Sequence, residues 1–279
     1  MNLVNELVNK SNYKQYLERM TESVQKSSKG LIPFYVSGKT LDVGCGSGVL
    51  LDILNKNGVE VEGIDINTEA IKVCYEKGLK AKCIPLDEVK EKYNTIIFSS
   101  VLHEFSSYDE NNRFSNKPII DALNAAKSIL NDNGKIIIRD GLKGDKSNGY
   151  LYAKDIKTVQ AFKNFINESP IFSHINKNEL FIVNETKITA PRWILKEFIF
   201  TYTWGEESWN REIQEQFGIL SKKEWKKVLN TCGLDTTVFT VSGEEYEKYA
   251  SNIFEDNKML HNILSECTVF IVAKKKTTY

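Results

Sequence analysis

The sequence lacks the features of a membrane or secreted protein. It contains no run of 18 or more apolar residues, so no segment is predicted to cross a bilayer. Its first residues, MNLVNELVNKSN, lack the basic and apolar regions of a signal peptide. Its five cysteines are odd in number, scattered and never in C-x-x-C spacing, which fits a reduced compartment better than a disulfide framework. We therefore expect a cytoplasmic protein.

Two further kinds of protein are disfavoured by what is missing. Lysine plus arginine and aspartate plus glutamate both number 37, so the chain has no overall basic charge to suit a nucleic-acid backbone. His103-Glu104 does not extend to H-E-x-x-H, because Ser107 stands where the second histidine would be, and no metal is predicted. The 279 residues are 41% hydrophobic and 27% charged, which is the composition of a globular protein.

The most informative stretch is KTLDVGCGSGVLLDIL, residues 39–54. It predicts a short apolar strand, then a turn with glycines at 44, 46 and 48, then a helix. Glycines permit positive φ and close backbone approach, and the helix N-terminus offers unpaired N–H groups to a polar ligand. A dinucleotide fingerprint G-x-G-x-x-G starting at Gly44 would need glycine at position 49, which is Val49. The turn therefore predicts a nucleotide site of another class.

The segment D-V-G-C-G-S-G, residues 42–48, resembles the first motif of the class I S-adenosylmethionine (SAM)-dependent methyltransferases. The resemblance covers residues 39–141 well and residues 221–274 loosely. It implies an α/β fold with a doubly wound, seven-stranded, mostly parallel Rossmann-like sheet, and S-adenosyl-L-methionine as cofactor. It also implies cofactor contacts from five residues of the motif, which are Asp42, Gly44, Cys45, Gly46 and Gly48.

An acid ends the second predicted strand, residues 59–65. Asp65 lies 65 − 44 = 21 positions after Gly44, close to the spacing of about 20 at which an acid meets a ribose in nucleotide-binding α/β folds. Its carboxylate would accept hydrogen bonds from both ribose hydroxyls, with Ile66 beside it. The alternative is that Asp65 only caps the helix that begins near Asn67-Thr68.

The third predicted strand, residues 80–84, departs from the family. An acid commonly follows this strand in the family and meets the adenine amino group, but Cys83-Ile84-Pro85-Leu86 supplies none. We therefore expect adenine to contact the backbone around Ile84 and Pro85, with Asp87 as a further candidate.

A fourth strand, residues 94–100, is followed by Val101-Leu102-His103-Glu104-Phe105. This segment resembles the fourth motif of the small-molecule branch of the family, and the D/N-P-P-Y/F signature of amino-methylating DNA and protein enzymes is missing. Ser99 and Ser100 are expected beside the cofactor. His103 is the candidate base, because an unperturbed imidazole titrates near neutral pH. The alternative is a packing or cofactor-contact role.

The fifth strand, residues 134–141, ends in Arg139-Asp140. Because the carboxyl ends of parallel strands share one edge of the sheet, Asp65, His103-Glu104 and Arg139-Asp140 are expected to converge there. Glu104 and Asp140 are the catalytic candidates behind His103, and Arg139 is a substrate-binding candidate.

A long insert separates this strand from the next family-like helix, which begins near Ser221 after 221 − 140 = 81 positions. That is too long for an ordinary connection. Residues 142–220 contain periodic segments and many aromatic residues, and they predict a substrate cap. Arg192, Trp193 and Trp204 are the substrate-binding candidates, with the alternative that these aromatics form the core of the insert.

The predicted domains are N-terminal lid helices at residues 1–30, a SAM-binding core at residues 31–141 and 221–279, and the inserted cap at residues 142–220. Within the first helices, Tyr16 and Met20 resemble a lid that closes over the cofactor, although a helix packed on the sheet without ligand contact fits as well.

The leading hypothesis is an enzyme that moves the methyl group of SAM in line to a small or medium-sized acceptor, using positioning and, where the acceptor must lose a proton, a base. RNA or nucleotide methylation, with the insert as recognition module, is an alternative. A third possibility is a non-catalytic protein that binds SAM or a partner. No membrane partner is expected.

Overall fold

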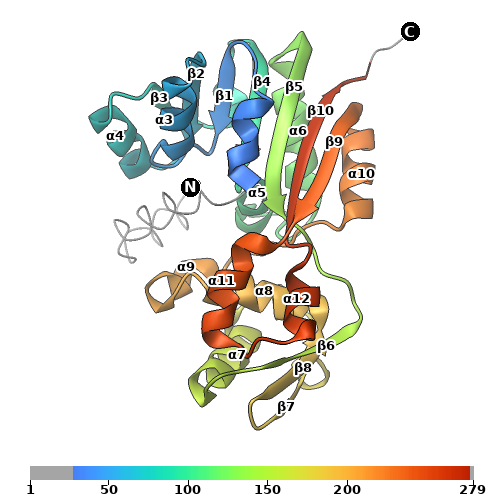
Figure 1. The fold of residues 1–279 in the computed structure, drawn as a ribbon. Helices are drawn as coiled ribbons and strands as arrows, with labels where there is room; N and C mark the ends of the chain where they lie inside the picture. The colour runs from blue at the N-terminus through green and yellow to red at the C-terminus, as the bar shows by residue number, and fades with distance from the viewer. Residues whose placement is uncertain (1–27, 277–279) are drawn as a thin grey trace.

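The computed structural model describes residues 28–276 in two halves joined by several crossings of the chain. Figure 1 shows a large sheet with flanking helices in the upper half and a smaller, mainly helical unit below it. The lower unit lies toward the end of the sheet where β4 leads into α5. The lower half thus covers the carboxyl ends of the parallel strands.

The large sheet has seven strands in the order β3-β2-β1-β4-β5-β10-β9. Their bounds are Thr40–Val43 for β1, Val61–Asp65 for β2, Ala81–Cys83 for β3, Tyr93–Ser99 for β4, Leu130–Gly141 for β5, Leu234–Ser242 for β9 and Thr268–Lys275 for β10. Strands β1 to β5 pair in parallel, whereas β10 runs antiparallel to both β5 and β9. The predicted seven-stranded, mostly parallel sheet is confirmed.

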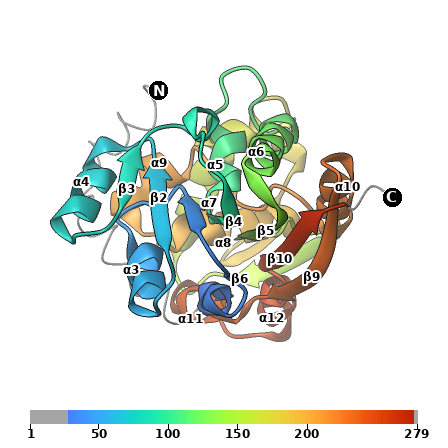
Figure 2. The same cartoon turned by 90° about the horizontal axis from the view of Figure 1, so that it is seen from above.

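Helices cover both faces of this sheet, as Figure 2 shows. They are the short η1 (Ser28–Phe34), α3 (Val49–Lys56), α4 (Thr68–Glu76), α5 (Leu102–Tyr108), α6 (Lys117–Ser128) and α10 (Lys222–Thr231). In β4, Ile96 and Phe98 pack in the cluster that includes residues of α6 and α10, whereas Ile97 packs with Leu50 of α3 on the other face. This alternation follows from the two-residue period of a strand, and burial on both faces explains the unbroken apolar run Ile96-Ile97-Phe98 in β4.

The lower half combines the insert with a later segment. From the insert come β6 (Asn148–Tyr152), α7 (Ile156–Glu168), β7 (Ile182–Asn184), β8 (Lys187–Pro191), α8 (Arg192–Tyr202) and α9 (Trp209–Glu212), together with short 3-10 turns. The strands form a small antiparallel sheet in the order β6-β8-β7. Phe162, Phe165 and Phe198 are fully buried in the hydrophobic core of this lower half.

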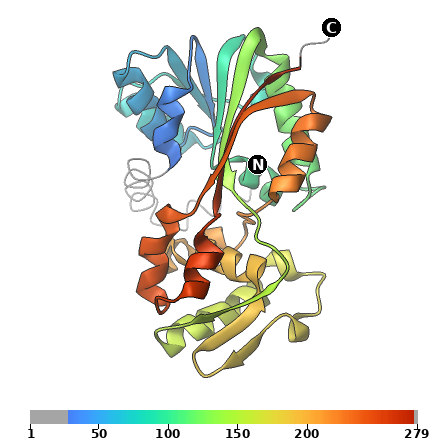
Figure 3. The same ribbon diagram turned by 45° about the vertical axis from the view of Figure 1, so that its right-hand side comes forward.

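The domain prediction needs one correction in this half. Residues 244–264 were expected in the core domain, but α11 (Glu244–Ile253) and α12 (Lys258–Leu264) lie beside the insert, below β9 and β10 (Figure 3). Ala250, Phe254 and Leu260 pack in the same buried cluster as Phe198 of α8. An amphipathic segment buries its apolar face wherever matching apolar surface lies, and here the insert provides that surface. The helix predicted to begin near Ser221 is α10, where Ser221 and Glu224 form a capping box.

No helix in the described part of the chain has the length and apolar character that a bilayer crossing needs.

Candidate active site

The glycine turn after β1 has one position open to a ligand. Gly44, Gly46 and Gly48 all have positive φ, at 69°, 52° and 76°. A Cβ at Gly44 would lie 2.4 Å from Val101, and one at Gly48 would lie 2.5 Å from Leu79, so packing requires glycine at both. A Cβ at Gly46 would have no neighbour within 4 Å. Gly46 is therefore the glycine at which a ligand can approach the backbone.

Asp65 holds this turn from the end of β2. Its Oδ2 accepts a hydrogen bond of 2.8 Å from the Gly46 N–H, and its Oδ1 accepts one of 2.8 Å from the Asn67 N–H. The Asn67 side chain caps α4 by accepting hydrogen bonds from the N–H groups of Glu69 and Ala70. The residue that caps this helix is therefore Asn67 and not Asp65. Burial raises the pKa of Asp65, opposed by these backbone donors and by the charge of Arg211.

A second acid lies under the turn, at Asp42 in β1. Asp42 is 2% exposed, and burial raises the pKa of its carboxyl to about 7 against the lowering effect of the Lys29 ammonium. Lys29 is itself buried in η1, and sequence reasoning missed it because nothing in a loop before the first strand marks a lysine as buried. Cys45 is also buried, and its thiol contacts the Gly46 carbonyl oxygen at 3.7 Å, so its side chain packs beneath the turn.

The edge predicted to meet adenine is open and partly apolar. Ile66, directly after Asp65, is 48% exposed. Across from it Ile84 is half-buried and Pro85 is exposed, and Cys83 contacts the Ile66 carbonyl oxygen at 3.7 Å. These positions bring the predicted residues of β2 and β3 to one edge. An exposed isoleucine there suits the flat apolar face of a base.

The ends of β4 and β5 are joined through Arg139. Arg139 is 7% exposed, its Nε donates a hydrogen bond of 3.0 Å to Ser28 Oγ, and its Nη1 donates to Ser100 Oγ. Ser100 has a positive φ of 59°, an uncommon conformation outside glycine. Ser99 precedes it at the end of β4. The guanidinium thus ties η1 to the strand ends, and these contacts favour a positioning role over the predicted substrate contact.

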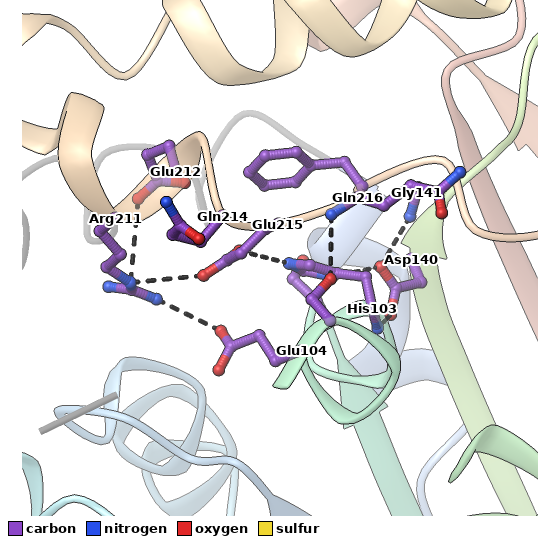
Figure 4. Close-up of polar contacts among 12 residues, drawn as sticks. His103, Glu104, Asp140, Gly141, Arg211, Glu212, Gln214, Glu215 and Gln216 are labelled. Carbon is purple, nitrogen blue, oxygen red and sulfur yellow. Dashed lines mark hydrogen bonds and ion pairs between the residues drawn. The ribbon is translucent and has the colours of Figure 1, made fainter. Parts of the chain in front are cut away.

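His103 lies between two carboxylates (Figure 4). Its Nδ1 is 2.7 Å from Asp140 Oδ1 and its Nε2 is 3.2 Å from Glu215 Oε2, while its ring lies 4.9 Å from that of Phe217. These carboxylates outweigh burial and hold the pKa of His103 well above its usual range, and the paired imidazolium keeps the pKa of Asp140 low. An imidazolium with both nitrogens engaged has no free site for another proton. The contacts favour the packing alternative over the predicted base.

Glu104 and three residues of the insert extend this arrangement into an acid-rich group. Arg211 Nη2 lies 3.3 Å from Glu104 Oε1 and its Nε lies 3.5 Å from Glu215 Oε1, which also accepts a hydrogen bond of 2.7 Å from the Tyr108 hydroxyl. Glu212 lies beside Arg211, at 4.0 Å from its Nε. Sequence reasoning missed Arg211, Glu212 and Glu215. The only signal was their charged pattern, NREIQEQ, between Trp209 and Phe217.

Buried hydrogen bonds place the segment 211–218 over His103. Glu197 in α8 accepts hydrogen bonds of 2.9 Å and 2.7 Å from the N–H groups of Phe217 and Gly218. The Gln216 N–H donates to Ser107 Oγ in α5 at 2.9 Å. The insert and the sheet half are thus joined directly at the candidate site.

The three predicted substrate-binding residues of the insert lie elsewhere. Arg192 faces Asp145, with 3.5 Å between Nη1 and Oδ2. Trp193 lies against Phe172, with ring centroids 5.8 Å apart, and both Trp193 and Trp204 pack against the buried cluster of the lower half. These contacts favour the alternative, in which the aromatics form the core of the insert.

Two predictions concern other parts of the site. Tyr16 and Met20, with the lid helices, lie outside the described residues. Within the described residues, one group has ligand atoms close enough for a metal ion: those of His103, Glu104 and Glu215 lie within 4.8 Å of one another. His103 is held protonated with both ring nitrogens against carboxylates, so it has no lone pair to offer a metal ion, which disfavours a metal there.

Comparison with known proteins agrees with this geometry. A family model described as a methyltransferase domain matches residues 13–170. An uncharacterised methyltransferase of Schizosaccharomyces pombe is 26% identical over 147 residues, covering 50% of this chain and 52% of that protein. A ribosomal RNA small subunit methyltransferase C of Shewanella is 31% identical over 130 residues, covering 43% of this chain and 34% of that protein. The chain therefore spans about half, or less, of the length of these curated relatives.

Among solved structures, a SAM-dependent methyltransferase from Archaeoglobus fulgidus has the same fold, with a TM-score of 0.53 and 16% identity over 95% of this chain and 100% of that one. The family model covers more than half of the present chain. The chain belongs to the methyltransferase-domain family, with the fold of the class I SAM-dependent methyltransferases.

Proposed function

We propose that the protein transfers the methyl group of SAM to a small-molecule acceptor bound between the carboxyl edge of the large sheet and the insert. The observation that carries this proposal is the open backbone at Gly46, held in place by Asp65. It is the feature that a nucleotide ligand needs and that packing alone would not require.

The residues of this chain fit the cofactor. Gly46 offers close backbone approach, Asp65 offers carboxylate oxygens to ribose hydroxyls, and Ile66 offers exposed apolar surface to the base. When bound, SAM supplies a methyl group already activated by the sulfonium. The work left to the protein is to hold the cofactor, orient the acceptor and exclude water.

The acceptor space follows from the architecture. Ligands of open α/β sheets lie beyond the carboxyl ends of the strands, and here residues 142–220 and 244–264 cover that edge. Because the segment 211–218 meets α5 there, we propose that it, with Glu104, forms the wall nearest the reacting group. The five cysteines are all unpaired, which supports a cytoplasmic location.

A nucleic-acid acceptor is the alternative, because one curated relative is named a ribosomal RNA methyltransferase. The match covers only 34% of that relative, and the present chain has equal numbers of basic and acidic residues. Binding of ribosomal RNA that weakens steeply with salt would favour this alternative. Salt-independent, weak binding would favour the small molecule.

The cofactor site is tested by titrating S-adenosylhomocysteine (SAH) into two glycine variants in a calorimeter. Gly46→Val should abolish binding, because its side chain fills the open approach. Gly58→Val is the matched control: Gly58 also has a positive φ, 75°, and open space at its Cβ, but it lies beyond the far end of α3. Backbone strain is then similar in both variants. Unchanged SAH binding in Gly46→Val would place the cofactor elsewhere.

A further inference from the structure

The group around His103 has more acids than bases. We call it the acid cluster: His103, Glu104, Asp140, Arg211, Glu212 and Glu215. Counted over these six side chains of the described residues 28–276, four carboxyl groups face one guanidinium and one imidazolium, so full ionisation would leave the cluster with two excess negative charges. All six side chains except that of Glu104 are less than a tenth exposed. Buried charge of one sign is costly unless it is paired.

The shortage of positive charge in the acid cluster is clearest at Glu212. It is 2% exposed, and its Oε1 has no hydrogen-bond partner. Arg211 Nε lies 4.0 Å away, which is too long for a hydrogen bond. Figure 4 shows Glu212 on one side of Arg211 and Glu104 on the other. A buried carboxylate oxygen without a donor indicates that the cluster is short of positive charge.

Arg211 is not available to bind an anion. It is already within 3.3 Å of Glu104 and 3.5 Å of Glu215. An acceptor carboxylate or phosphate would meet several buried acids around one neutralised guanidinium. The cluster therefore disfavours anionic acceptors and suits cationic ones.

Glu104 is the member that reaches the cofactor side of the site. Its side chain is 28% exposed, and its contact with Arg211 uses only Oε1. The Glu104 N–H donates a hydrogen bond of 3.0 Å to the Val101 carbonyl oxygen, and the Val101 side chain packs against Gly44 of the glycine turn. The cluster and the proposed ribose site therefore border the same region.

We propose that the methyl acceptor is an amine, whose ammonium group binds at Glu104 while Glu215 supplies balancing negative charge and Glu212 releases its proton to solvent when the cation binds. This inference rests on the proposed function of the site. For transfer, the ammonium gives a proton to the Glu104 carboxylate and the freed nitrogen lone pair forms the new N–C bond. The C–S bond breaks at the same time, and its electron pair stays on sulfur. Glu104 is thus the proton acceptor in this step, and Glu212 acts through charge alone.

The test uses the full chain saturated with SAH and measures thermal unfolding. The probes are amines paired with the alcohols of the same shape: benzylamine with benzyl alcohol, hexylamine with hexanol, and tyramine with 4-(2-hydroxyethyl)phenol. At least one amine should raise Tm by about 2–4 °C at a concentration tenfold above its Kd, and its alcohol should not. Failure of every amine to exceed its alcohol would overturn the proposal.

Two variants test whether stabilisation by an amine depends on the acid cluster. Glu104→Gln keeps the shape and removes the charge, and it should weaken amine affinity at least tenfold while SAH affinity changes less than twofold. If Glu104→Gln does not fold, amine affinity and SAH affinity are measured in Glu212→Gln instead, with the same expected directions. Glu206→Gln is the control, because Glu206 is an acid of the same insert that pairs with Lys157 at the surface.

Three outcomes would each contradict the amine assignment. Equal loss of SAH and amine binding in Glu104→Gln would assign the cluster to the cofactor. Stabilisation of the wild type by Mg²⁺, Mn²⁺ or Zn²⁺ but by no amine, lost in Glu104→Gln, would assign it to a metal ion. An amine effect that persists in both cluster variants would place the amine elsewhere. Absence of SAH binding in the wild type would instead refute the proposed function itself.

Discussion

Replacement of Asp65 should weaken cofactor binding, and the structure sets limits on the expected loss of affinity. In Asp65→Ala the ribose loses a charged hydrogen-bond acceptor, which is worth roughly 1.5–3 kcal/mol. At about 1.4 kcal/mol for each factor of ten, SAH affinity should fall roughly ten- to a hundredfold. The carboxylate also accepts 2.8 Å hydrogen bonds from Gly46 and Asn67, so the open turn loses its support in the same variant. We therefore expect the upper part of that range.

The assay is calorimetric titration with SAH, with thermal unfolding recorded alongside to separate binding from stability. Asp65→Asn should give an intermediate loss, because the amide keeps one acceptor oxygen but brings an NH₂ group toward a backbone N–H. Asp52→Ala is the matched control, since Asp52 is an exposed acid of α3 whose side chain pairs with Lys56. A change below about twofold in Asp65→Ala, with Tm lowered, would reduce Asp65 to a support of the turn and refute the ribose assignment.

Two further variants test the acid cluster and the insert. Burial raises the pKa of Glu212 from 4.5 to about 8, so the folded state binds the extra proton between those values and stability falls as pH rises across them. Glu212→Gln should accordingly raise Tm little at pH 5 and most near pH 8 to 9. A constant difference across that range would show that Glu212 is not a buried, uncompensated acid. Trp204→Ala should cost about 2 kcal/mol or more in urea unfolding and leave SAH affinity unchanged, because Trp204 packs in the insert. Unaltered stability with altered acceptor kinetics would instead assign Trp204 to the substrate-binding site.

The sequence by itself determined the fold class and the residues of the proposed cofactor site. The strand, glycine turn and helix at residues 40–56 are coded by residues close in the chain, as are β2 and the acid that ends it. Local propensity, glycine conformation and fixed spacing within one β-α-β unit are enough to place Gly46 beside Asp65. The resemblance to a known family rests on the same short segments.

Only the tertiary structure decided the acceptor half. The partners of His103 come from residues 140 and 215, and the segment that carries Glu215 is held by Glu197 and Ser107. No local pattern encodes such contacts between residues tens to more than a hundred positions apart. His103 could be read from sequence as an ordinary imidazole, but its protonation depends on two acids that the fold brings to it.

The insert shows the same limit for packing. Its aromatic residues could be read as a pocket wall or as a core, because both need apolar surface, and only the contacts of Trp193 and Trp204 in the fold favour the core. The helices at residues 244–264 joined the insert because its buried cluster offered the apolar surface that their own apolar faces required. An amphipathic pattern shows that a face will be buried, and only the assembled fold shows against what.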